Sequence, residues 1–92
     1  MSGKSLIKST SEQVLIAKSV DAKGTRCPVP LLRAKQALKA VSVGEYVEVL
    51  ATDPSAKPDF DAMLKHLPHE LVDYSEGTGT PRVDRFVILK GE

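Results

Sequence analysis

The segment GTRCPVPLL, residues 24–32, contains the single cysteine of the chain and places prolines at positions 28 and 30. A helical repeat of apolar residues begins directly after it. Proline is tolerated in the first turn of a helix because the N–H groups there have no intrahelical partner. We therefore predict that Cys27 lies at or just before a helix N-terminus, where its thiol is available for nucleophilic chemistry.

That position also predicts an acidic thiol. The partial positive charge at a helix N-terminus favours an anion, and free N–H groups point towards it. Arg26 is adjacent, and Lys23 and Arg33 are near in sequence. We expect the pKa of Cys27 to lie below the value of free cysteine, about 8.5. A lone cysteine is often a small buried hydrophobe, but the prolines, the helix start and the arginine favour a reactive thiol.

The rest of the sequence narrows the chemistry of this thiol. One cysteine excludes an internal disulfide and dithiol exchange within one chain. A cysteine hydrolase needs an oriented histidine, whereas His66 and His69 fall at the far end of a second predicted helix. Their HxxH spacing has no cysteine or carboxylate to complete a usual metal set, so we predict no metal site. The remaining possibility is a thiol that forms a covalent adduct and transfers it to another molecule.

Six elements are expected to position this segment. β-rich or alternating runs predict strands at residues 14–20, 45–52, 69–75 and 82–90. Apolar spacing predicts one helix from Leu31 towards Gly44, and a second with its apolar stripe from Phe60 to Leu67, ended by Pro68. This β-α-β-α-β-β order predicts an α/β (α+β) two-layer sandwich, with two helices on one face of a four-stranded mixed sheet.

Length and composition limit the domain organisation and the partners. Residues 1–12 are polar and predict a flexible tail, and residues 13–92 predict a single domain. A net charge of +1 and 4% aromatic residues argue against direct nucleic-acid binding. The sequence has no apolar run of membrane-spanning length and does not start like a signal peptide. We expect a cytoplasmic protein without membrane contacts.

Further polar residues have two interpretations each. Asp53-Pro54 is typical of a turn, and Asp59 of a helix start, although either could serve the site. Arg82 and Arg85 are expected to pair with carboxylates or solvent, or to steer an acidic partner.

One apolar residue breaks the pattern of the first helix. On a helical wheel, Leu32 falls on the outward face, near the same helix end as Cys27. With Arg33 and Lys35 beside it, we predict that Leu32 contributes to a surface on which partner proteins dock.

A family resemblance rests on the run DAKGTRCPVP (21–30), followed by Lys35, Gly44-Glu45, Asp53-Pro54, Asp59 and a final ILKG. With its CPxP motif, the chain resembles the TusA/SirA-like sulfur-carrier family over nearly all residues after the first dozen. The resemblance implies the same two-layer fold. It also implies that Cys27 accepts a sulfane sulfur as a persulfide and passes it to a cysteine of an acceptor protein, without a separate cofactor. Gly24, Arg26, Pro28 and Pro30 belong to the motif that supports the thiol.

The resemblance also implies the kinds of partner. The donor would be a cysteine desulfurase or a rhodanese, and the acceptor a DsrE-type relay protein serving thiouridine formation in tRNA, or a related protein of sulfur oxidation. Val29 stands where the best-known tRNA-thiolation member has an acidic residue, so the branch and the acceptor stay open. Two alternatives also stay open: a small nucleic-acid-binding or regulatory module, and a single-thiol redox sensor whose resolving cysteine comes from another molecule.

Overall fold

The computed structural model describes residues 15–92, so the tail expected at residues 1–12 lies outside the described residues. The elements follow the predicted β-α-β-α-β-β order. They are β1 (Ile16–Ala22), α2 (Val29–Ala40), β2 (Tyr46–Ala51), α3 (Ala56–Leu64), β3 (Glu70–Ser75) and β4 (Asp84–Leu89). No helix within residues 15–92 is long and apolar enough to cross a membrane.

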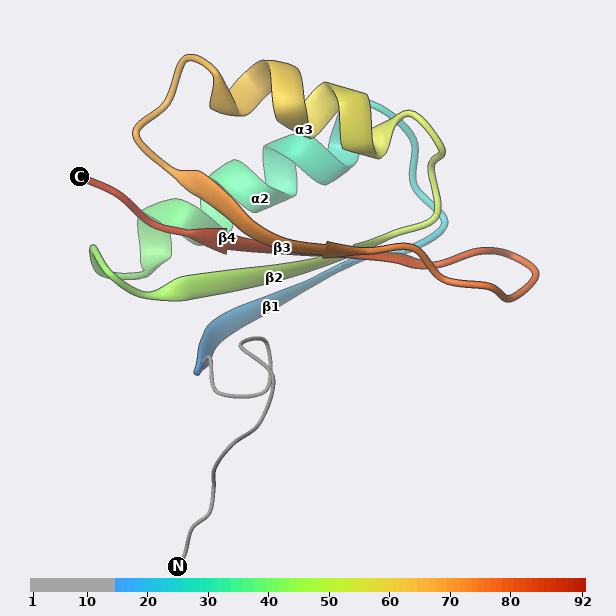
Figure 1. Cartoon of the computed structure of the whole chain (residues 1–92), viewed down its shortest axis with the longest axis horizontal. Coiled ribbons are helices and arrows are strands. Elements are labelled where there is room, and N and C mark those ends of the chain that lie inside the picture. The colour runs from blue at the N-terminus through green and yellow to red at the C-terminus, as the bar shows by residue number, and fades with distance from the viewer. Residues whose placement is uncertain (1–14) are drawn as a thin grey trace, which may run out of the picture.

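The four strands form one mixed sheet with the order β1-β2-β4-β3. β1 and β2 are parallel, as expected for strands joined by a helical crossover, and β4 runs antiparallel to both β2 and β3. Both helices cover the same face of this sheet (Figure 1). The predicted two-layer arrangement is therefore confirmed.

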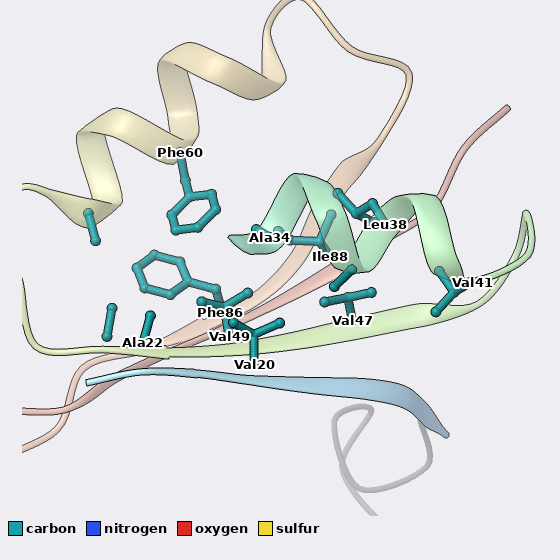
Figure 2. Packing of buried hydrophobic residues seen from close by; sticks show 13 residues of the cluster. Val20, Ala22, Ala34, Leu38, Val41, Val47, Val49, Phe60, Phe86 and Ile88 are labelled. Atoms are coloured by element: carbon teal, nitrogen blue, oxygen red, sulfur yellow. The ribbon is translucent and has the colours of Figure 1, made fainter. Parts of the chain in front are cut away.

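The core lies between the sheet and the two helices (Figure 2). Alternate residues of β2 point into it, and Val47, Val49 and Ala51 are completely buried. Phe60 of α3 packs on Phe86 of β4 with 4.8 Å between ring centroids. Truncating a buried aromatic residue to alanine typically costs about 3–5 kcal/mol. This contact is thus a main anchor of α3, the helix that carries Asp59.

Several predicted boundaries were wrong, two of them next to the loops that surround Cys27. The first strand extends to Ala22 because Asp21 and Ala22 continue the parallel pairing with Leu50 and Ala51 of β2. The second helix starts earlier than expected, at Ala56, within the segment interpreted as a turn.

The reason for the early start is the position of Pro58. This proline lies in the first turn of α3, where its missing N–H costs no hydrogen bond. The helix therefore starts at Ala56, inside DPSAKPD, while Asp53 and Pro54 stay in the preceding loop; it ends at Leu64, before the predicted end at Leu67.

The topology brings three connecting segments to one end of the molecule. Both helices begin at the end of the sheet where β1 and β2 finish, and the β3–β4 loop lies at that end too (Figure 1). The chain ends at the opposite side of the sheet (Figure 1). The loop that contains Cys27 therefore lies beside the loop that leads into α3.

Candidate functional site

Cys27 is exposed, in the loop between β1 and α2. Pro28 is the N-cap of α2 and Pro30 is buried in its first turn. The predicted position of the cysteine, just before a helix N-terminus, is confirmed. The loop is tied to the residue that follows β2, because Gly24 donates its N–H to Thr52 Oγ1 (2.9 Å). Gly24 has φ +80°, a value that side chains disfavour and that explains the glycine here.

Asp53 connects the Cys27 loop to the β2–α3 loop. Its Oδ2 accepts the backbone N–H of Cys27 (2.7 Å), and its Oδ1 accepts the N–H and the hydroxyl of Ser55 (3.0 Å each). The bonds from the Ser55 and Cys27 N–H groups lower the pKa of Asp53. Asp53 thus makes the predicted turn and also binds the backbone of the cysteine.

Asp59 lies in the first turn of α3 and acts on the pKa of the Cys27 thiol. Hydrogen bonding to the Asp59 side chain is the main cause of the raised pKa of Cys27; desolvation and the negative charges of Asp59 and Asp53 act in the same direction. The sequence-based expectation of a lowered pKa was therefore wrong. A carboxylate favours the protonated thiol because it accepts its hydrogen and repels the thiolate.

The helix N-terminus does not supply the donors on which that expectation depended. Proline has no N–H, so positions 28 and 30 offer none. Val29 donates its N–H to the carbonyl of Arg26 (2.8 Å), and the N–H of Cys27 is bonded to Asp53. The positive charge of Arg26 contributes to lowering the pKa of Asp53, not that of the thiol. The negative charge next to the N-terminus of α2 therefore belongs to the Asp53 carboxylate and not to a Cys27 thiolate.

Sequence reasoning found Cys27 but assigned Asp53 and Asp59 chiefly to a turn and a helix start. Both aspartates also perform those local roles, which hid their contact with a residue at least 26 positions away. The available signal was their place in the motif residues shared with the sulfur-carrier family.

A hollow of about 550 Å³ adjoins the cysteine loop. Its walls come from Arg26 on that loop, Thr52 and Asp53 after β2, and Pro81 of the β3–β4 loop. Three segments distant in sequence thus form this hollow next to the loop that contains Cys27.

Of the three predicted docking residues, Arg33 does not share the exposed face of Leu32 and Lys35. Leu32 is 51% exposed on α2, as the helical wheel predicted. Arg33 turns towards β1, where it donates to the Asp21 carbonyl (2.9 Å). Lys35 instead lines a pocket near the end of the chain. Leu32 therefore shares its face of α2 with Lys35, while Arg33 points towards β1.

The remaining charged candidates have structural partners. Arg82 pairs with Asp84 (2.9 Å), whose side chain is nearly buried, and with Glu76 (3.7 Å). Arg85 pairs with Glu48 and with Asp73 (3.5 Å) on the face of the sheet away from the helices. Within residues 15–92, no group of three or more His, Cys, Asp or Glu side chains could hold a metal ion.

Comparison with known proteins identifies the family. Residues 18–90 match the family model described as sulfurtransferase TusA. The sulfur carrier protein TusA of Allochromatium vinosum is 45% identical over 62 residues, 67% of this chain and 82% of that protein. TusA of Pseudomonas fluorescens is 36% identical, covering 75% of this chain and 83% of the relative.

A solved structure supports the same assignment. The crystal structure of a SirA-like protein from Desulfitobacterium hafniense superposes with a TM-score of 0.64 at 26% identity. The match covers 82% of this chain and 99% of that one. The chain belongs to the TusA/SirA-like family of sulfur carrier proteins.

Proposed function

We propose that this protein carries a sulfane sulfur as a persulfide on Cys27, in the cytoplasm, between a donor such as a cysteine desulfurase or rhodanese and a relay protein of the DsrE type. The observation that carries the proposal is one exposed cysteine, whose backbone N–H is bound by Asp53 and whose thiol pKa is raised mainly by Asp59. Thiolation of tRNA and sulfur oxidation are the two pathways that such a carrier would serve.

The transfer itself needs no external oxidant. The Cys27 sulfur attacks the outer sulfur of a donor persulfide, the donor S–S bond breaks, and the donor cysteine leaves with the electron pair as a thiolate. The outer sulfur, with its hydrogen, is then bonded to Cys27. The Cys27 proton ends on the donor thiolate, so a thiol and a persulfide have exchanged places. Transfer to the acceptor is the same reaction with Cys27 as the leaving group.

Asp59 is suited to handle the proton in both directions. Its side chain is the main cause of the raised pKa of the thiol, and in this proposal it accepts the proton when Cys27 attacks. In the second transfer the same group can return a proton to the departing sulfur. This matters because a thiol with a raised pKa is a slow leaving group when it departs as the bare thiolate.

The redox-sensor alternative is disfavoured by the same geometry. Susceptibility of a thiol to oxidation follows its thiolate character. The raised pKa of Cys27, caused mainly by its bond to Asp59, keeps the thiol protonated to a higher pH. The arrangement suits a thiol that reacts within a docked complex.

Direct sulfur loading tests the proposed function. Incubation with a cysteine desulfurase and cysteine should add one sulfur atom to the intact protein, detected as about 32 Da by mass spectrometry and consistent with a reducible adduct on its single thiol. The sulfur should be lost on treatment with dithiothreitol. Protein that stays unmodified with both a competent desulfurase and a competent rhodanese would contradict the proposal.

We also propose that Leu32 belongs to the docking surface. Because its side chain is about half exposed, Leu32→Ser should change the free energy of unfolding by less than about 0.5 kcal/mol. Sulfur transfer from a protein donor should slow at limiting donor concentration, because apolar area next to the thiol is lost. Loading by inorganic polysulfide, which needs no docking surface, should keep its wild-type rate.

Val43→Ser is the matched control for Leu32→Ser, because Val43 is 62% exposed but follows the other end of α2. It should leave both rates unchanged. A melting temperature strongly lowered by Leu32→Ser, or an unchanged transfer rate, would remove Leu32 from the docking surface.

A further inference from the structure

A second feature of the helical layer lies away from the thiol. A pocket of about 270 Å³ opens between the second half of α2, the segment after α3 and the end of the chain. Its walls include two apolar side chains, Leu38 and Leu67, together with His69. Three lysines surround it: Lys35 and Lys39 from α2, and Lys90 after β4.

None of these three lysines has a carboxylate within 4.0 Å among residues 15–92. Lys90 donates to the Val41 carbonyl (2.7 Å), which holds its ammonium group in place without neutralising it. Glu92 also lines the pocket and is its one acidic side chain. The arginines Arg82 and Arg85, in contrast, are both ion-paired. With three lysines and one glutamate, the pocket carries net positive charge.

His69 adds a polar group to this pocket without adding charge at neutral pH. Its Nδ1 accepts the N–H of Gly91 (3.1 Å), which assigns the ring proton of the neutral form to Nε2. Partial burial and the charge of Lys90 lower the pKa of His69. An anion in the pocket would thus meet ammonium groups, with an apolar wall behind them.

We propose that this pocket binds an acidic segment of a partner protein, in which carboxylate side chains alternate with apolar ones. Carboxylates would pair with Lys39 and Lys90, and an apolar neighbour would lie against Leu67, above the buried Leu38. The apolar wall favours a peptide over an inorganic anion, which would leave that surface unused. That the partner is a sulfur donor or acceptor rests on the proposed function.

The pocket is placed to orient such a partner relative to the thiol. Leu32, Lys35 and Lys39 are spaced by three and four residues, so they share one outward face of α2. Leu32 and Lys39 are seven positions apart on α2, about 10 Å along the helix axis. A partner that contacts Leu32 near the thiol can therefore reach the pocket with the same surface. Two separated contacts determine an orientation that one contact leaves free.

Binding of a defined peptide tests the pocket directly. The probe is acetyl-Glu-Leu-Glu-Glu-Leu-amide, titrated into 15N-labelled protein and followed by two-dimensional NMR. The largest amide shifts are expected at Lys39, His69 and Gly91, and the affinity should fall as salt is added. Lys39→Glu should weaken binding at least tenfold. The peptide with glutamine in place of glutamate should not bind.

Lys18→Glu is the matched control, because Lys18 is also exposed and has no carboxylate partner among the described residues, but lies on β1. It changes the net charge equally and should leave peptide affinity within about twofold, since separated surface charges are largely screened. Equal weakening by both variants would show nonspecific charge attraction and overturn the proposal. Absence of shifts around the pocket at millimolar peptide would also overturn it.

The outcome is separable from that of the proposed function. Cys27→Ser should bind the peptide with wild-type affinity, because the thiol is no part of the pocket. If the protein binds the peptide but never loads sulfur, the pocket proposal stands and the sulfur-carrier proposal fails. Sulfur loading without peptide binding would do the reverse.

Discussion

Cys27→Ser is expected to reduce sulfur transfer to the background rate while the protein stays folded. Serine has no sulfur with which to form the S–S bond of a persulfide, and Cys27 is the single cysteine of the chain. Because the thiol is exposed, the substitution should change the melting temperature by no more than about 4 °C. Transfer of 35S from labelled cysteine through a desulfurase to the carrier measures the first effect, and thermal unfolding measures the second.

A chemical control accompanies this variant. Wild-type protein alkylated with iodoacetamide can react only at Cys27, since no other thiol exists in the chain. It should lose transfer to the same extent as Cys27→Ser. Residual transfer in both preparations would place the sulfur on another group and contradict the proposed site. A collapse of stability in the serine variant would assign the cysteine a structural role.

Asp59→Asn is expected to lower the pKa of Cys27 and to slow sulfur transfer between proteins. The carboxylate is the largest cause of the raised pKa, both as hydrogen-bond acceptor and as a negative charge, and asparagine removes the charge. The rate of alkylation by iodoacetamide, measured against pH, should therefore reach its midpoint at a lower pH. At neutral pH the variant thiol should react faster with iodoacetamide than the wild type.

The rate of sulfur transfer should fall although the rate of alkylation rises. This difference separates the effect of Asp59 on the thiol pKa from its role in moving the proton. Asparagine cannot take the proton from Cys27 or return it, so transfer should slow although more thiolate is present. Asp61→Asn is the matched control: Asp61 lies on the same helix but pairs with Lys57 at the i−4 position. It should leave the thiol pKa unchanged. Faster transfer in Asp59→Asn would show that Asp59 only restrains the thiolate.

The raised thiol pKa also has a consequence for stability. The folded chain holds the Cys27 proton more tightly than the unfolded chain does. The resulting stabilisation is present at neutral pH and is lost as the pH rises through the pKa of the folded state. The free energy of unfolding of the wild type should thus decline at alkaline pH more steeply than that of Asp59→Asn. Urea unfolding at neutral and alkaline pH measures the difference.

Local sequence patterns determined the order of elements and the place of the cysteine. The alternation in β2 and the apolar spacing in α2 each reflect one buried face, and such periodicity can be detected within a single segment. Pro28 and Pro30 marked the start of α2 because their effect on the backbone is equally local. The exposure of Leu32 followed from the same helical geometry.

Only the tertiary structure decided the electrostatics of the thiol. Asp53 and Asp59 belong to a loop and a helix far along the chain, and the parallel pairing of β1 with β2 brings both beside Cys27. Arg26, the nearest charged residue in sequence, contributes to lowering the pKa of Asp53 and is not among the causes that shift the thiol pKa. A pKa depends on charges and hydrogen bonds within a few ångströms, and these distances are set by the packing of α3 on the sheet. Packing of the helices on the sheet also joins residues of three segments into the pocket that Lys35, Lys39 and Lys90 surround.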